Sequence, residues 1–304
     1  MAQAKLTVVI LFGGNSYEHV VSCDSARAVS ARLCEYGYDL RLVGIAKSGQ
    51  WCRQEYQQLQ QQVQVDERQP LHTSIYPDTD NFLAELDLTG RSKSEIVIFP
   101  VLHGNNGEDG RMQGLLELAG FPYIGASLLG SALANDKVVA KELVHSAGLP
   151  VVPSVSFLYP NWQHDLGQHN RGAYQQHIAD RLSYPLYVKP ATAGSSIGIK
   201  KIATAAELDE AVRYAANYSV KILVEQAVDA QEIECAVIGD LAPVAAPMLG
   251  EISPLTGFYD YHAKYIDAST VEVVVPARIE TALADKVRKA AVRIFRCLQL
   301  HGLA

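Results

Sequence analysis

Residues 185 to 200 carry the side chains that could hold a polyphosphate. In this run, PLYVKPATAGSSIGIK, Lys189 follows a short apolar β-run and Pro190 ends the hydrogen-bond ladder of the strand. Backbone N–H groups and hydroxyls of the small-residue loop that follows could turn toward one point beside the lysine ammonium. The loop residues placed to do so are Gly194, Ser195, Ser196 and Gly198. Without support from the rest of the chain, such a run is more often an ordinary surface turn.

Four other charged residues stand where they could contact a ligand. Glu18 follows the first predicted strand, and Lys137 lies in the first turn of a predicted helix, where a cation opposes the helix dipole. Glu225 and Glu232 flank a short polar turn between two predicted strands, a spacing compatible with binding the polar edges of a nucleoside. Each of the four also has a simpler interpretation as a solvated side chain, and that alternative stays open.

In the first part of the chain, strands alternate with helices, which predicts a parallel sheet with helices packed on it. His103 ends one of these strands, and Asp109 could cap the helix that follows. The glycine pair after the first strand lacks the G-x-G-x-x-G spacing of a dinucleotide-binding turn. We expect strands at 6–12, 39–46, 95–102 and 121–125, helices at 22–33 and 112–119, and a peripheral insertion of little periodicity at 52–94.

Shorter elements are predicted for the rest of the chain. Asn135 is expected to cap a helix over 136–147, and residues 160–172 are expected to form a polar loop. Residues 251–267 contain proline, glycine and four aromatic residues, which is typical of a mobile loop with its own packing. Further strands are expected at 154–159, 186–188, 221–226, 233–238 and 271–276, and helices at 173–182, 205–217 and 280–298.

Length and composition describe a globular protein of two or three domains. The 304 residues are 48% hydrophobic and 19% charged, with a formal net charge of -7. This charge argues against nucleic acid or an anionic membrane as the main partner. No apolar run reaches the roughly 18 residues that span a bilayer, so we expect a cytoplasmic protein. Five scattered cysteines without a Cys-x-x-Cys motif predict neither a disulfide framework nor a zinc site.

Seven motifs occur along the chain: LFGGNSYEH, FPVLHGNNGEDGRMQGLLELAGFPYIG, ALANDK, PLYVKPATAGSSIGIKKI, ILVEQAV with EIECAV, GFYDYHAKYID and VPARI. In their order and spacing the chain resembles the D-alanine:D-alanine ligases, members of the ATP-grasp superfamily, from about residue 6 to residue 304.

The resemblance implies a combined α/β and α+β fold. A parallel-sheet (pre-ATP-grasp) domain at 1–125 precedes an ATP-grasp small lobe at 126–220 and a large lobe at 221–304, which includes a lid loop at 251–267.

The resemblance also implies a role for individual residues in ATP binding. Lys137 and Lys189 resemble the two lysines that contact phosphates in the family, and the loop from 194 to 198 resembles its phosphate-covering loop. Glu225 matches the residue at the adenine edge, and Glu232 matches the ribose-binding carboxylate. The full set of ATP-binding residues implied in this way is Lys137, Lys189, Gly194, Ser195, Ser196, Gly198, Glu225, Gln226, Val228 and Glu232.

The resemblance also implies that Glu18, Ser195, Tyr265 and Lys264 are catalytic and that Glu18 and His103 bind the amino-acid substrate. Glu18 resembles the glutamate that holds the ammonium of the first D-alanine, with Ser195 and Tyr265 as its hydrogen-bonded partners. Lys264 would face the transferred phosphate, and His103 falls near the first substrate. The tyrosine at 265 favours an amine as the nucleophile, which is D-alanine, or D-serine in the resistance-type relatives.

The implied reaction joins two D-alanines through an acyl phosphate, with ATP and Mg²⁺, for peptidoglycan precursor synthesis by a homodimer. The family continues beyond position 304 with Arg-x-Asp and Asn-Glu-x-Asn segments, which carry its magnesium ligands. No metal ligand is therefore assigned, and the chain is expected to be C-terminally truncated and inactive as given. The alternatives are a D-alanine:D-serine ligase and a non-catalytic nucleotide-binding remnant.

Overall fold

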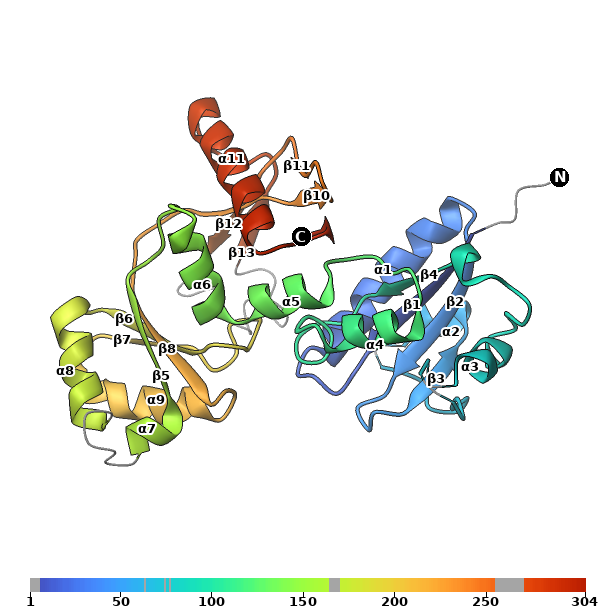
Figure 1. Ribbon diagram of the computed structural model, residues 1–304, viewed down its shortest axis with the longest axis horizontal. Helices are drawn as coiled ribbons and strands as arrows, with labels where there is room; N and C mark the ends of the chain where they lie inside the picture. Colours follow the sequence, from blue (N-terminus) through green and yellow to red (C-terminus); the bar gives the residue numbers. More distant parts are fainter. Residues whose placement is uncertain (1–5, 63, 74, 77, 164–169, 255–270) are drawn as a thin grey trace. The chain divides into compact units, whose positions relative to one another are not determined.

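The computed structural model describes residues 6–62, 64–73, 75–76, 78–163, 170–254 and 271–304. The chain divides into two compact units, residues 1–132 with 300–304, and residues 133–299 (Figure 1). The predicted lid, with Lys264 and Tyr265, lies outside the described residues. The predicted domain boundaries at 125 and 220 stay predictions.

The first unit is built on a four-stranded sheet in the order β3-β2-β1-β4. Strands β1 (Thr7–Gly13), β2 (Asp39–Ile45) and β4 (Ile96–Pro100) are parallel, as predicted. Every residue of β1 is buried, because this inner strand is covered on both faces. Strand β3 (Trp51–Gln54) is antiparallel to β2, so the sheet is mixed.

Helices cover both faces of this sheet (Figure 1). Helix α1 (His19–Glu35) shares a core with alternate residues of β1, among them Ile10 and Phe12. On the other face Val9 and Leu11 pack in a core with α3 (Thr79–Glu85) and α4 (Arg111–Ala119). The remaining elements of this unit are α2 (Tyr56–Leu59), the 3-10 turn η1 (Lys93–Glu95) and β14 (Gly302–Leu303).

Three predictions for this unit are wrong. Residues 52–94 are not merely peripheral, because β3 pairs with β2 and Phe82 and Leu83 enter the core. The predicted strand at 121–125 is reduced to a single bridge between Ile98 and Tyr123. Gly110, with a φ of 92°, takes the N-cap position of α4 in place of Asp109, whose carboxylate accepts from the N–H groups of residues 106 and 111. Residue 110 adopts a left-handed backbone conformation, which favours glycine.

The second unit contains an antiparallel sheet in the order β5-β8-β6-β7. Trp162 of α7 packs on its core, stacks on Phe157 at 5.0 Å and donates a hydrogen bond to Asp209. The strands are β5 (Ser154–Leu158), β6 (Leu186–Pro190), β7 (Lys200–Ile202) and β8 (Lys221–Gln226). The associated helices are α7 (Tyr159–Gln163), α8 (Arg171–Arg181), η2 (Ala205–Glu207) and α9 (Leu208–Ala216).

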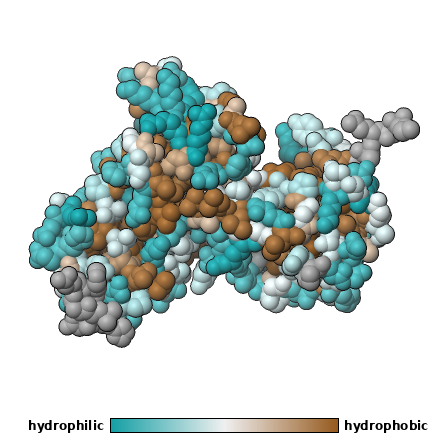
Figure 2. All heavy atoms as spheres, viewed as in Figure 1, coloured by the Kyte–Doolittle hydropathy of each residue, from teal (hydrophilic) through white to brown (hydrophobic). Residues whose placement is uncertain are grey.

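A second antiparallel sheet of this unit has the order β13-β12-β9, and β10 pairs with β11. Exposed apolar side chains gather on this pair, where Figure 2 shows brown spheres, and Ile238 and Val244 are both more than half exposed. The strands are β9 (Glu232–Glu234), β10 (Val237–Gly239), β11 (Val244–Ala245), β12 (Gly250–Pro254) and β13 (Val271–Val274). Helix α6 (Lys137–Ser146) and helix α11 (Thr281–Cys297) also belong to this unit, and α5 (Leu128–Asn135) crosses the boundary between the units.

Three predictions for the second unit are also wrong. Asn135 ends α5, and the carboxylate of Asp136 caps α6 instead, since it accepts from the N–H groups of residues 138 and 139. Helix α7 enters the predicted loop at 160–172, because Trp162 and Phe157 bury each other. The predicted strand at 233–238 is two short strands with different partners. No helix in the described ranges is long and apolar enough to cross a membrane.

Candidate functional site

Lys137 joins the start of helix α6 to the segment that follows β6. Its backbone N–H donates to the carbonyl oxygen of Ala191 at 3.0 Å, and its ammonium donates to the carbonyl oxygen of Ala193 at 2.5 Å. These bonds explain why a cation occupies the first helical turn despite the helix dipole. The helix therefore holds the beginning of the predicted phosphate loop.

Lys189 and Glu225 form an ion pair between neighbouring strands. Lys189 lies on β6 and Glu225 lies on β8, and the two strands pair antiparallel. The second oxygen of the Glu225 carboxylate accepts a hydrogen bond from Lys141 of α6 at 2.6 Å. All three side chains are largely buried, with exposed fractions of 18%, 13% and 18% for Lys189, Glu225 and Lys141. One carboxylate thus holds two ammonium groups from two directions.

The protonation of Glu225 follows from this arrangement. Burial on its own would raise the pKa of the carboxyl group, but the charge of Lys189 and the hydrogen bonds from Lys141 and Lys189 outweigh burial and lower the pKa. Glu225 therefore stays ionised well below neutral pH.

Lysines outnumber carboxylates among the described residues around this ion pair. Lys221 pairs with Asp136, the residue that caps α6. The described residues here include four ammonium groups and two carboxylates, which suits a ligand with several negative charges. The six side chains are Lys137, Lys141, Lys189, Lys221, Asp136 and Glu225.

The loop from 194 to 198 has an uncommon backbone. Ser195 and Ser196 adopt φ values of 48° and 57°, in the left-handed region that residues other than glycine rarely enter. Such a conformation costs on the order of 1–2 kcal/mol per residue and is often found at ligand-binding loops. At Gly198, with a φ of 76°, a Cβ atom would lie 2.6 Å from the ring of Tyr218. The close contact fixes where the loop returns to β7.

The other predicted ATP-binding residues are spread over this unit. The side-chain amide of Gln226 is bonded to the backbone of Ser183 through both its oxygen and its nitrogen, at 2.7 and 2.5 Å. Val228 is exposed, and Glu232 is an exposed residue of β9, in a different sheet from Glu225. The structure thus joins Lys189 to Glu225 and Lys137 to the backbone just before the loop, while contacts of Gln226, Val228 and Glu232 with ATP stay predictions.

In the first unit, Glu18 and His103 lie at the carboxyl edge of the parallel sheet. Glu18 precedes α1 and is buried, and at Gly104, with a φ of 72°, a Cβ atom would lie 2.3 Å from its carboxylate, so Glu18 would have to shift for any other residue. The His103 ring contacts the Ser25 hydroxyl at 3.0 Å and the Glu108 carboxylate at 3.3 Å. The hydrogen bond with Glu108 raises the pKa of His103, opposed by burial and aided by the charges of Glu108 and Glu18.

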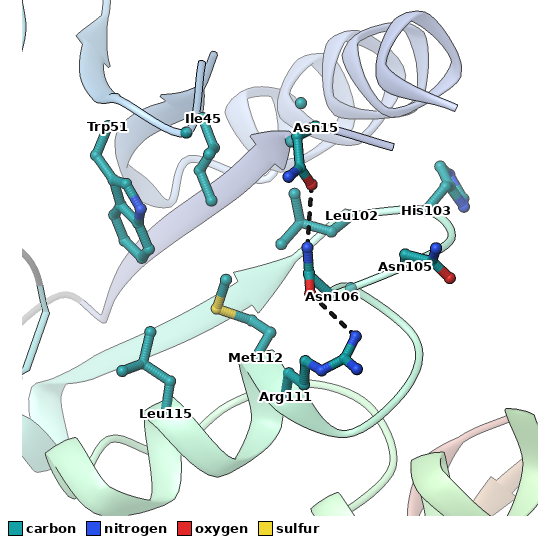
Figure 3. Close-up of a pocket in the computed structure, with 14 residues that line it drawn as sticks. Asn15, Ile45, Trp51, Leu102, His103, Asn105, Asn106, Arg111, Met112 and Leu115 are labelled. Carbon is teal, nitrogen blue, oxygen red and sulfur yellow. Dashed lines mark hydrogen bonds between the residues drawn. The ribbon is translucent and has the colours of Figure 1, made fainter. Parts of the chain in front are cut away.

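A pocket of about 360 Å³ opens at the same edge (Figure 3). His103 lies at its rim, on the side away from Trp51, and Met112 of α4 lines its floor. Asn106 donates to Asn15 at 3.0 Å and accepts from Arg111 at 3.2 Å, which ties both flanking loops to α4. Pockets beyond the carboxyl ends of parallel strands commonly bind ligands in α/β folds.

Sequence reasoning missed Lys141, Lys221 and Asp136. Lys141 follows Lys137 by four residues, so helical geometry places both on one face of α6. The four-residue spacing could therefore have indicated Lys141 from the sequence. Lys221 and Asp136 carry no such indication, because they are 85 positions apart in the chain and meet only in the folded structure. Contacts between Glu18 and its predicted partners Ser195 and Tyr265 stay predictions.

The residues fit a polyphosphate better than they fit a metal ion. The ammonium groups suit the negative charge of ATP, whereas no group of three or more His, Cys, Asp or Glu side chains that could hold a metal occurs in the part of the chain that the structure describes. None of these residues is therefore proposed to bind Mg²⁺.

Comparison with known proteins identifies the class of protein as an ATP-grasp-type ligase. The D-ala D-ala ligase N-terminus model matches residues 7–126, and the D-ala D-ala ligase C-terminus model matches residues 143–304. The chain belongs to the D-alanine–D-alanine ligase family, and the predicted family is confirmed. A parallel sheet in the N-terminal unit together with antiparallel sheets is typical of these ligases.

Individual relatives agree with this family. The chain is 39% identical to the D-alanine–D-alanine ligase of Ruminiclostridium cellulolyticum and 36% identical to D-alanine–D-alanine ligase A of Salmonella typhimurium, over 99% of this chain and 82% of each relative. Among solved structures, the VanG D-Ala:D-Ser ligase from Enterococcus faecalis is 32% identical with a TM-score of 0.78, over 98% of this chain and 84% of that one. The D-alanine–D-alanine ligase from Coxiella burnetii is 25% identical with a TM-score of 0.74, over 99% of this chain and 80% of that one.

Proposed function

We propose that the protein joins two molecules of D-alanine into D-alanyl-D-alanine with ATP as the energy source. The observation that carries this proposal is the hydrogen bond from the Lys137 ammonium to Ala193, next to the small-residue loop and four residues beyond Lys189. Ammonium groups fixed there would neutralise the phosphate oxygens of ATP as charge develops on them. Glu225 would lie at the edge of the adenine ring of the bound ATP.

The proposed reaction has two steps. The carboxylate of the first D-alanine attacks the γ-phosphorus of ATP, which forms an acyl phosphate and releases ADP. The amine of the second D-alanine then attacks the acyl carbon, which forms the peptide bond and releases phosphate and a proton. Lys137 and Lys189 act in the first step by orienting the phosphates, because phosphoryl transfer depends mainly on position and electrostatic stabilisation.

We place the first D-alanine near the carboxyl edge of the N-terminal sheet. The buried Glu18 carboxylate suits an ammonium group, and His103 at the pocket rim suits a carboxylate, since its raised pKa favours the protonated ring. The pocket of about 360 Å³ is ample for a small amino acid.

D-Serine is the second candidate for the amine substrate. The similarity to the VanG D-Ala:D-Ser ligase structure favours testing it. Comparison of D-alanine and D-serine as competing second substrates, with both dipeptides measured in one reaction, distinguishes the two ligases.

Several finer expectations stay predictions. They are the role in peptidoglycan precursor synthesis, the cytoplasmic location, the homodimer and the requirement for Mg²⁺. The expected truncation and inactivity of the 304-residue chain receive no support from the comparisons, and an assay of the product tests the inactivity.

The test is to incubate the protein with ATP, MgCl₂ and D-alanine and to measure ADP and dipeptide by mass spectrometry. Our proposal predicts equal amounts of ADP and D-alanyl-D-alanine, with neither formed from L-alanine. ATP binding without either product would favour the non-catalytic remnant and would contradict the proposed activity.

A further inference from the structure

Lys141 belongs to the charged cluster, but the proposed function gives it no task. Its ammonium donates to the Glu225 carboxylate at 2.6 Å and to the carbonyl oxygen of Val152 at 2.7 Å. Both acceptors lie on chain segments outside α6, so the lysine is fixed between them. A largely buried lysine held in this way is expensive to desolvate, which calls for an explanation beyond surface solubility.

The position of Lys141 bears directly on Lys189. Both ammonium groups share one carboxylate, through different oxygens. If Lys141 were absent, Glu225 would keep Lys189 as its partner and would attract it with its whole charge. Lys189 would then be less able to turn toward another anion, because its departure would leave the buried Glu225 carboxylate without a positively charged partner.

We propose that Lys141 is a positioning residue for the triphosphate site, which holds Glu225 in place so that Lys189 can pass from this carboxylate to the phosphates of a bound nucleotide. The inference rests on the proposed function and extends it to a residue that does not itself touch the ligand. With Lys141 present, Glu225 stays paired when Lys189 leaves.

The positioning role predicts a pattern that a merely structural role would not produce. Lys141→Met leaves Glu225 to Lys189 alone, so affinity for a triphosphate should fall. In a Glu225→Gln background the side chain at 225 no longer attracts Lys189 by its charge, so the loss of Lys141 should have little further effect on affinity. Lys141→Arg keeps the charge and the donor and should bind normally.

The experiment is isothermal titration calorimetry of the full chain and these variants with the non-hydrolysable analogue AMP-PNP. The temperature is kept well below the thermal unfolding midpoint of each protein. We expect about tenfold weaker binding by Lys141→Met, as for a buried charge pair that loses one partner. Compared with Glu225→Gln alone, Lys141→Met in that background should change the affinity by less than about threefold, and Lys141→Arg should bind within about threefold of the unaltered protein. Lys289→Met, an exposed lysine of α11, is the matched control for loss of one positive charge and should bind normally.

The outcomes separate this inference from the proposed function. Unchanged affinity in Lys141→Met, or an equal loss when Lys141→Met is added to Glu225→Gln, overturns the positioning role while the nucleotide site stands. A lowered unfolding midpoint with unchanged affinity means that Lys141 is only structural. No binding of AMP-PNP to the unaltered protein overturns the proposed function, and the inference falls with it.

Discussion

Lys137 and Ala193 are joined by a hydrogen bond of 2.5 Å from the lysine ammonium to the backbone carbonyl oxygen, across 56 positions of the chain. The bond fixes the first turn of α6 to the segment that leads into the small-residue loop. It places a positive charge beside the loop.

Replacement of Lys137 by methionine should weaken this connection. The carbonyl group of Ala193 would lose its charged donor, so we expect the free energy of unfolding to fall by about 1–2 kcal/mol. Urea denaturation measures this change, and Lys289→Met is the control that should stay within about 0.5 kcal/mol of the unaltered protein. An equal effect of both substitutions would mean that the contact contributes nothing.

Replacement of Gly198 by alanine should destabilise the loop. The positive φ costs an alanine on the order of 1–2 kcal/mol, and its Cβ would meet the Tyr218 ring at 2.6 Å. We expect a lower thermal midpoint and weaker nucleotide binding. Gly172→Ala, in α8, is the matched control. Its Cβ would make only an ordinary contact, and alanine in a helix is favoured by about 0.5–1 kcal/mol, so the midpoint should hold or rise.

The buried Glu251 carboxylate should govern stability in acid. Hydrogen bonds from the side chain and backbone N–H of Arg278 lower its pKa from 4.5 to about 2. Because the folded pKa lies below the unfolded one, this contribution is complete above about pH 4.5 and is lost as the pH falls toward 2. Arg278→Met should therefore move the acid-unfolding midpoint to higher pH, followed by circular dichroism. Arg32→Met, which removes an exposed ion pair with Glu35, should leave the midpoint in place.

The raised pKa of His103 predicts the opposite pH dependence. The ring gains its hydrogen bond to Glu108 in the folded protein, so its contribution to stability is complete below the ordinary value of 6.5 and is lost as the pH rises through the folded pKa. NMR titration of labelled histidine rings, with His103→Gln to assign the signal, measures this pKa. Glu108→Gln should lower it toward 6.5, and a signal that does not move would contradict the proposed pairing.

Much of the fold could be predicted from residue patterns. The buried run at 6–12 and its two neighbours predicted the parallel strands because inner strands of such sheets are apolar throughout. Strand β3 was missed since WCRQ is too short to show alternation and is recognised only by its pairing with β2. The cap of α6 was misplaced by one residue, as asparagine and aspartate are equally good caps in sequence.

The candidate site was predictable in its lysines and its loop but not in its charge balance. Family position pointed to Lys137, Lys189 and Glu225, whereas the sharing of Glu225 with Lys141 depends on how α6 packs beside β8. The same limit applies to Gln226, whose amide is bonded to Ser183 across 43 positions. Such long-range contacts leave no trace in local spacing.

The central claim is that the loop and its lysines form the nucleotide site, and hydrogen exchange tests it most directly. Exchange of the peptide over residues 189–198 is compared by mass spectrometry with and without saturating AMP-PNP, for the unaltered protein and Lys189→Met. We predict that the nucleotide slows exchange in this peptide of the unaltered protein and has little effect in the variant at the same concentration. Nucleotide binding that leaves this peptide unchanged and protects another part of the chain would contradict the claim.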